Sequence, residues 1–255
     1  VENHPRFCKQ MNAKDISIEL RNVNKSFKAY TQSFFTVRQR IFNLRLTSKS
    51  KKMLALKNIN LKIYRDECIG VIGRNGSGKS TLIKVMSGAI KVDKGGSVVK
   101  NGNSILLNLG VGFSHELTAR ENIYVNGSTL GLKIKEIDQL FDQIIQFAEL
   151  EDFVDTKIKY FSSGMIKRLS FSIAVYVKAD ILFLDEVFAV GDEKFREKAT
   201  VLLEESWIKD RTVVMVSHSA NLIKKYCSKT ILMHHGEMVF FVDTETAIEK
   251  YRSLS

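Results

Sequence analysis

The chain has 255 residues, of which 44% are hydrophobic and 26% charged, and its formal net charge is +11. These values are typical of a globular domain, alone or with a smaller lobe, and they exclude a disordered chain. No run of about 18 uncharged apolar residues is present and no signal peptide is apparent, so we expect no membrane-spanning helix.

The cysteines bear on the redox compartment of the protein, and the charged residues are unevenly distributed along the chain. Cys8, Cys68 and Cys227 are widely spaced, which favours a reduced compartment and no metal site. Cys68 and Cys227 lie in or beside apolar runs, where we expect them to be buried. Residues 20–65 contain twelve Lys and Arg residues and no Asp or Glu, so the remainder of the chain nets 11 − 12 = −1 and the basicity is local.

Strand and helix patterns alternate along the chain. Residues 16–27 alternate as an edge strand, and residues 28–53 form a basic insertion in which apolar positions 34, 37, 41 and 44 are spaced as in a short amphipathic helix. Further strands are predicted at 54–63, 68–72, 97–99, 181–184 and 212–216, with a hairpin over 229–233 and 238–242. Helices are predicted over 81–88, 135–150, 163–177, 193–208 and 246–254. This alternation indicates an α/β fold with a largely parallel central sheet.

Residues 73–80 read Gly-Arg-Asn-Gly-Ser-Gly-Lys-Ser and match the phosphate-binding loop pattern Gly-x-x-x-x-Gly-Lys-Ser/Thr. The glycines let backbone N–H groups converge on an anion, Lys79 places a positive charge on the β- and γ-phosphates, and the Ser80 hydroxyl can hold Mg²⁺. A buried strand enters this loop, and a helix leaves it with its N-terminus towards the anion. We therefore expect a nucleoside triphosphate and Mg²⁺, bound by Gly73, Arg74, Asn75, Gly76, Ser77, Gly78, Lys79, Ser80 and Thr81.

Two further strand ends carry candidate catalytic residues. The strand at 181–184 ends in Asp185-Glu186. A carboxylate there suits Asp185 as an anchor for Mg²⁺, and Glu186 can orient a water for in-line attack on the γ-phosphate. His218 follows the strand at 212–216 and can hydrogen-bond the γ-phosphate or that water. A solvated acidic pair and a surface histidine are the alternatives, but the phosphate-binding loop favours the catalytic interpretation.

Residues 161–165, Phe-Ser-Ser-Gly-Met, precede a long helix. Small residues at a helix N-terminus leave N–H groups available to an anion. An ordinary serine N-cap explains the same residues and, taken alone, is the favoured interpretation.

Taken together, the motifs resemble the nucleotide-binding subunit of ABC transporters, in which the phosphate loop, a Ser-Gly signature, the Asp-Glu strand and a switch histidine come in this order. The resemblance covers residues 16–252. It implies that Phe27 stacks on adenine and that residues 189–192 form the loop after the catalytic glutamate. It also implies a variant signature that contacts nucleotide, formed by Ser162, Ser163, Gly164 and Met165.

The sequence resembles one subfamily of ABC transporters more than the others. Residues 106–113, 116–123, 160–165 and 185–192 are similar to those of exporters of lipid-linked polysaccharide, of the capsule, O-antigen and teichoic-acid types. Three departures stand out. Leu109 occupies the position of the usual coupling glutamine, so the neighbouring Asn108 is assigned that role. Prolines are missing beside His115 and before Lys157, and we expect no carbohydrate-binding extension after residue 255.

The resemblance also implies an organisation and partners. We expect an ABC-type P-loop NTPase spanning 16–255, with a mainly parallel central sheet, an antiparallel β subdomain and a helical subdomain at about 113–165, after an N-terminal extension at 1–15. The expected assembly is a head-to-tail homodimer that traps two ATP between phosphate loop and signature. It would bind integral membrane permease subunits at the cytoplasmic face of the cell inner membrane.

Two questions stay open at this point. The basic insertion at 28–53 suits a solvated loop, a contact with anionic lipid or a lipid-linked glycan, or nucleic-acid binding through Phe34, Phe35 and Phe42; of these, nucleic acid is the least favoured. The rival functions are a soluble ABC ATPase acting on nucleic acid or ribosomes, and a regulatory nucleotide switch without hydrolysis. A single cassette without an extended heptad region argues against the first, and Glu186 with His218 argues against the second.

Overall fold

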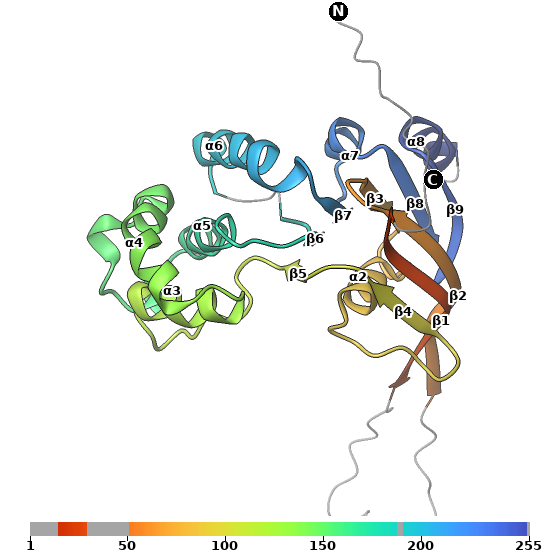
Figure 1. Cartoon of the computed structure of the whole chain (residues 1–255), viewed down its shortest axis with the longest axis horizontal. Coiled ribbons are helices and arrows are strands. Elements are labelled where there is room, and N and C mark those ends of the chain that lie inside the picture. Colours follow the sequence, from red (N-terminus) through yellow and green to blue (C-terminus); the bar gives the residue numbers. More distant parts are fainter. Residues whose placement is uncertain (1–14, 30–50, 188–190, 254–255) are drawn as a thin grey trace, which may run out of the picture.

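A computed structural model describes residues 15–29, 51–187 and 191–253 of the chain (Figure 1). Three expected features lie wholly or partly outside the described residues. They are the amphipathic helix within 28–53, all but the last residue of the N-terminal extension at 1–15, and the first half of the loop at 189–192.

The central sheet has the strand order β5-β6-β7-β3-β8-β9. Its strands are β3 (Cys68–Ile72), β5 (Ser104–Leu107), β6 (Ile181–Asp185), β7 (Thr212–Val216), β8 (Lys229–His234) and β9 (Glu237–Asp243). All neighbours are parallel except β8 and β9, which form the predicted antiparallel hairpin. Strands β3 and β7 are apolar runs buried along their whole length, as expected for parallel strands covered on both faces. The predicted mainly parallel α/β sheet is confirmed.

A second, antiparallel sheet contains β1 (Ile16–Ala29), β2 (Lys51–Tyr64) and β4 (Ser97–Lys100), in the order β2-β1-β4. The prediction that 16–27 is an edge strand is wrong, because β1 pairs with β2 on one side and β4 on the other. Period-two alternation marks a half-buried strand but does not reveal whether its edges are paired. The register places Phe27 opposite Met53 and Lys28 opposite Lys52, so β1 and β2 extend into the basic insertion.

Helices connect the strands. Those predicted from the sequence correspond to α2 (Lys79–Ser87), α4 (Ile134–Ala148), α5 (Ser163–Ala174), α6 (Glu193–Leu203), which continues as a π-helical turn (Glu204–Ile208), and α8 (Thr244–Ser253). Short 3-10 turns occur at Glu151–Phe153 and Ile158–Tyr160. Helices α3 (Ala119–Thr129) and α7 (Ala220–Tyr226), with β5, were not predicted. The sequence of α3 is rich in Asn, Gly, Ser and Thr, and a Thr118–Glu121 capping box fixes its start.

Helix α5 joins two hydrophobic clusters. Phe171 packs with Phe195 and Trp207 beside the central sheet. Leu169 and Ile173, on another side of α5, belong to the cluster formed with α3 and α4. Figure 1 shows α3 and α4 to one side of the two sheets, with α5 between them and the strands. The orientation of α5 therefore couples the helical part to the sheet.

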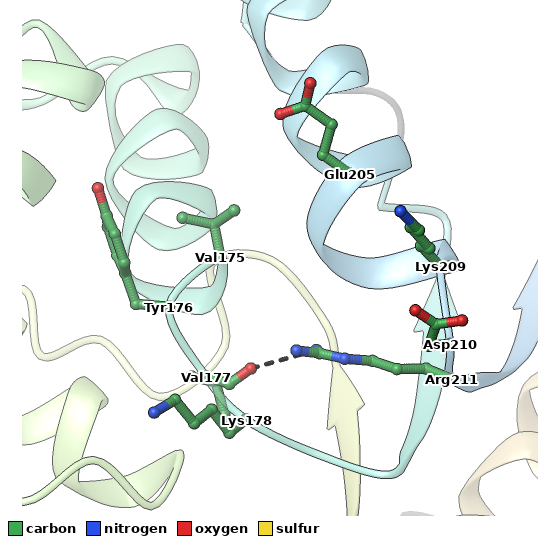
Figure 2. A pocket seen from close by; sticks show the side chains of 8 residues that line it. All are labelled: Val175, Tyr176, Val177, Lys178, Glu205, Lys209, Asp210 and Arg211. Atoms are coloured by element: carbon green, nitrogen blue, oxygen red, sulfur yellow. Dashed lines mark hydrogen bonds between the residues drawn. The ribbon is translucent and has the colours of Figure 1, made fainter.

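The far end of α5 is tied to the start of β7. Arg211 Nη1 donates a 3.4 Å hydrogen bond to the carbonyl of Val177, across a pocket of about 460 Å³ (Figure 2). Burial lowers the pKa of Arg211, and the charge of Asp180 acts in the opposite direction. This pocket lies by the amino ends of β6 and β7, away from the strand ends that carry the candidate site.

Candidate functional site

The phosphate-binding loop lies between the end of β3 and the start of α2. Gly73 has a φ of 144°, in the region that favours glycine, and a Cβ there would lie 2.3 Å from the carbonyl oxygen of Met233. Gly78 precedes the first residue of α2 with a φ of 107°. The loop is therefore packed against β8 so closely that only glycine fits at its first position.

Lys79 reaches back over this loop. Its Nζ donates to the carbonyls of Gly73 at 2.8 Å and Arg74 at 3.1 Å. Burial lowers the pKa of Lys79, while the charges of Glu186 and Asp185 act in the opposite direction. The Ser77 hydroxyl is the one buried side-chain oxygen without a hydrogen-bond partner among the described residues. A buried cation beside an unpartnered hydroxyl suits a phosphate group.

A pocket of about 620 Å³, named here the hairpin-side pocket, opens on one side of the loop. Phe27 from β1 lines it with Met53 and Leu54 from β2, as does the turn His235-Gly236 between β8 and β9. These apolar side chains are at least 37% exposed, so they offer a wall on which a flat ring can stack. The remaining lining residues are Ala55, Lys57, Gly76, Gly78, Lys79, Ser80 and Thr81.

A second pocket of about 300 Å³, the carboxylate-side pocket, is lined by Ser80, Asn108, Leu109, Lys167, Asp185 and Glu186. Ser80 lines both pockets, so the two spaces meet at the first turn of α2. A molecule with a ring at Phe27 and a phosphate chain along the loop would therefore place its last phosphate near the carboxylates.

The two carboxylates differ in environment. Asp185 ends β6, where burial, with the charge of Glu186 adding to it, raises the pKa of its carboxyl against the opposing charges of Lys84 and Lys79. Glu186 has a left-handed φ of 55° and its N–H donates to the carbonyl of Val216 at 3.1 Å. Its Oε1 lies 2.9 Å from Nε2 of His218, and both side chains are half exposed.

The signature residues lie apart from these pockets. The Ser162 hydroxyl caps α5 by accepting the N–H of Met165 at 3.2 Å, as the simpler interpretation of the sequence expected. Ser162 and Ser163 are exposed, and residues 162–165 line neither pocket. Asn108, by contrast, lies in the carboxylate-side pocket.

Several lining residues were not predicted. Met53 and Leu54 join the site because the β1–β2 register brings them beside Phe27. Gly236 donates its N–H to the carbonyl of Ser77 at 2.9 Å, so the β8–β9 turn abuts the phosphate-binding loop and carries His235 into the pocket. Lys167 lies on α5, two residues after the signature. Each of these residues enters its pocket through contacts between segments that are distant in the sequence, so no local pattern identified them.

Comparisons with known proteins agree with this geometry. The sequence model of the family described as ABC transporter matches residues 56–189, more than half of the chain. The O-antigen export system ATP-binding protein RfbB of Klebsiella pneumoniae is 36% identical, over 92% of this chain and 97% of its own length. The teichoic acids export ATP-binding protein TagH of Listeria innocua is 37% identical, over 93% of this chain and 70% of its own.

Among solved structures, the dimeric ATP-binding cassette MJ0796, in a post-hydrolysis state bound to ADP and Pi, superimposes with a TM-score of 0.68. The superposition covers 89% of this chain and 98% of the MJ0796 chain, at 23% sequence identity. At this identity, the similarity shows the fold alone. The fold and the site define a P-loop nucleoside triphosphatase. The chain belongs to the ABC transporter family and carries its ATP-binding domain, so the resemblance stated from the motifs is confirmed. Within the described ranges, no helix has the length and apolarity needed to cross a bilayer.

Proposed function

We propose that this chain is the ATP-hydrolysing subunit of an ABC transporter that exports a lipid-linked cell-surface polysaccharide. The observation that carries the proposal is the likeness to O-antigen and teichoic acid export ATP-binding proteins, at 36% and 37% identity over more than nine-tenths of the chain. The two pockets that meet at Ser80 supply a site suited to the reaction.

In this proposal, the adenine of ATP stacks on Phe27, and the triphosphate follows the N–H groups of residues 73–81 to Ser80. Ser80 and Asp185 supply oxygen ligands of the kind that Mg²⁺ prefers, and both line the carboxylate-side pocket. Bound Mg²⁺ would neutralise charge on the β- and γ-phosphates. Glu186 orients the attacking water, and His218 holds Glu186 in place through their 2.9 Å contact.

The signature needs a second copy of the chain. Ser162, Ser163, Gly164 and Met165 line neither pocket of their own copy, and the two serines are exposed, which suits a contact with nucleotide bound to a partner. We propose a head-to-tail homodimer in which closure on two ATP excludes water and strengthens the charge contacts at the γ-phosphate. Closure and reopening would move membrane permease subunits at the cytoplasmic face of the inner membrane, with Asn108 near that coupling contact.

The end of the β1–β2 hairpin supports a contact with anionic lipid or a lipid-linked glycan. Lys28 lies opposite Lys52 in the register, and Lys51 is adjacent. Like charges directly opposite one another on a hairpin are destabilising, and an anion would offset that cost. A basic residue near an anionic leaflet contributes about 1 kcal/mol of binding free energy.

Co-purification tests the transporter assignment. We expect the tagged full chain, expressed in its own cells, to retain a multi-helix membrane protein through detergent extraction, and a Glu186→Gln chain to leave polysaccharide inside the cell. Retention of ribosomes or RNA without any membrane protein, together with RNA-stimulated ATP hydrolysis, would establish the soluble alternative instead.

Vesicle co-sedimentation tests the lipid contact separately. The full chain should sediment with vesicles containing anionic lipid and stay in solution with neutral vesicles at the same salt concentration. Charge reversal by Lys28→Glu with Lys52→Glu should reduce the bound fraction severalfold. Equal binding to both vesicle types would remove the lipid contact from the proposal.

A further inference from the structure

Two cysteines that the proposed reaction does not use lie side by side in the core. Cys68 is the first residue of β3, and Cys227 lies between α7 and β8. Their Sγ atoms are 3.7 Å apart, although the two residues are 159 positions apart in the sequence. Both are free cysteines, and they are 8% and 5% exposed, so the expected burial is confirmed. The fold therefore brings two distant thiols together in a position shielded from solvent.

Hydrogen bonds fix the backbone of both cysteines. The carbonyl of Cys68 accepts the N–H of Ser228 at 3.0 Å, at the point where β3 and β8 begin to pair. Cys227 donates its N–H to the carbonyl of Ile223 at 2.9 Å, and its own carbonyl accepts the hydroxyl of the buried Thr244 at 2.8 Å. Neighbouring strands lie about 4.8 Å apart, within the range of Cα separations that disulfides span. Small side-chain rotations would therefore bring the two sulfurs to bonding distance, about 2.0 Å.

The surroundings of the pair keep it reduced until the structure opens locally. Both cysteines belong to the hydrophobic cluster that contains Trp207 and Ile223. The contact with Cys68, followed by burial, raises the pKa of the Cys227 thiol, so the reactive thiolate is scarce in the closed structure. Access requires the displacement of α7, which has only seven residues and one buried side chain, that of Ile223. A helix this short has little stability of its own, so local opening is expected there.

We propose that Cys68 and Cys227 are a redox modification site, at which hydrogen peroxide forms a reversible disulfide that stabilises the fold. One thiol ionises, its sulfur attacks a peroxide oxygen, and the O–O bond breaks to leave a sulfenic acid and hydroxide, which takes up the released proton to form water. The second thiol sulfur then attacks the sulfenic sulfur, the S–O bond breaks, and the hydroxyl leaves with the proton of the second thiol as another water. Two electrons pass from the two sulfurs to the peroxide. A small dithiol reverses the change by thiol–disulfide exchange.

The position of the pair indicates a stabilising bond rather than an inhibitory one. Cys68 and Cys227 lie at the amino ends of β3 and β8, whereas the phosphate-binding loop and the turn that abuts it follow the carboxyl ends of the same two strands. β3 has five residues, at about 3.3 Å each, so the bond would form well away from the nucleotide pockets. In the unfolded chain it would close a very long loop, which reduces the entropy gained on unfolding.

The test uses the full chain with Cys8→Ser, so that only the pair remains, treated with hydrogen peroxide under native conditions. We expect both titratable thiols to be lost and peptide mapping by mass spectrometry to find Cys68 joined to Cys227. Tm should rise by about 5 °C or more and return to its starting value after dithiothreitol. The rate of ATP hydrolysis should stay within twofold. The matched controls add Cys68→Ala or Cys227→Ala to Cys8→Ser, and peroxide should not raise the Tm of either.

Three results would overturn the inference. The first is that both cysteines remain thiols, or become separate sulfinic acids, at peroxide concentrations that oxidise cysteine in the same buffer. The second is a cross-link that forms only in urea, because the folded chain would then not hold the pair within reach. The third is a native disulfide that lowers Tm or abolishes ATP hydrolysis, which would contradict the stabilising role. Failure of the proposed function is distinguishable, because it would appear as an absence of ATP hydrolysis by the reduced chain.

Discussion

Glu186 Oε1 lies 2.9 Å from Nε2 of His218, although the two residues follow different strands. The central sheet sets this proximity, because β6 and β7 are parallel neighbours and Asp185 pairs with Val216 at their carboxyl ends. The carbonyl of Val216 accepts the N–H of Glu186. A left-handed non-glycine residue costs about 1 kcal/mol or more, and such strain is found where function fixes the backbone.

Replacement of Glu186 tests its role directly. Glu186→Gln keeps the shape of the side chain but cannot accept the water's proton, so we expect ATP binding and dimerisation to persist while turnover falls more than tenfold. Phosphate release and size-exclusion chromatography with ATP measure the two effects. Glu197→Gln, an exposed position on α6, is the control. Turnover of Glu186→Gln within tenfold of the unmodified chain would refute the assignment.

Lys79 should decide affinity rather than turnover. Lys79→Ala removes the buried cation of the phosphate-binding loop, and hydrogen bonds to charged groups contribute about 1.5–3 kcal/mol each. The dissociation constant for ATP should therefore rise about 10- to 100-fold, as measured by calorimetry. The exposed Lys94→Ala, next to β4, should leave it unchanged. Retained tight binding would mean that Lys79 does not contact the nucleotide.

Elements that are marked by a short sequence pattern could be predicted from the sequence. The loop at 73–80, the carboxylates after β6 and the histidine after β7 each follow an apolar strand, so parallel pairing alone brings them to one edge of the sheet. Helix α3 escaped prediction because it buries polar residues, Asn122 and Asn126, in place of an apolar stripe. Helix α7 escaped because it is only seven residues long.

The missed site residues depend on tertiary structure. Met53 enters the hairpin-side pocket through the β1–β2 register, and Lys167 enters the carboxylate-side pocket through the packing of α5. His235 lies in the turn of the predicted hairpin at 229–242, but the contact of this turn with Ser77 follows from the pairing of β3 with β8. Patterns along the chain do not encode such contacts between distant segments.

Substitution of two glycines in the phosphate-binding loop distinguishes the destabilisation caused by steric crowding from that caused by backbone strain. Both Gly73 and Gly76 have positive φ, but a Cβ on Gly73 would meet the Met233 carbonyl at 2.3 Å, whereas nothing lies within 4 Å of one on Gly76. Gly73→Ala should lower the free energy of unfolding by about 3 kcal/mol or more, and Gly76→Ala by about 1 kcal/mol. Urea denaturation measures both, and equal losses would contradict the packing of this loop on β8.

His235 occupies an unusual backbone position where it lines the hairpin-side pocket. Its φ is 44° and that of Gly236 is 84°, as in the tight turns that join antiparallel strands. The neighbouring His234 contacts the ring of His235 at 4.3 Å between centroids but does not line the hairpin-side pocket. The pair therefore offers a matched comparison.

We expect His235→Asn to weaken ATP binding about three- to tenfold and to leave the binding of inorganic triphosphate unchanged. The imidazole lines the pocket that Phe27 and Met53 also line, where we propose that the base and ribose bind. Asparagine tolerates the left-handed conformation, so the turn should persist. His234→Asn is the control and should bind both ligands like the unmodified chain. Equal losses for ATP and triphosphate would place His235 at the phosphates instead, and no loss for either would exclude contact with the nucleotide.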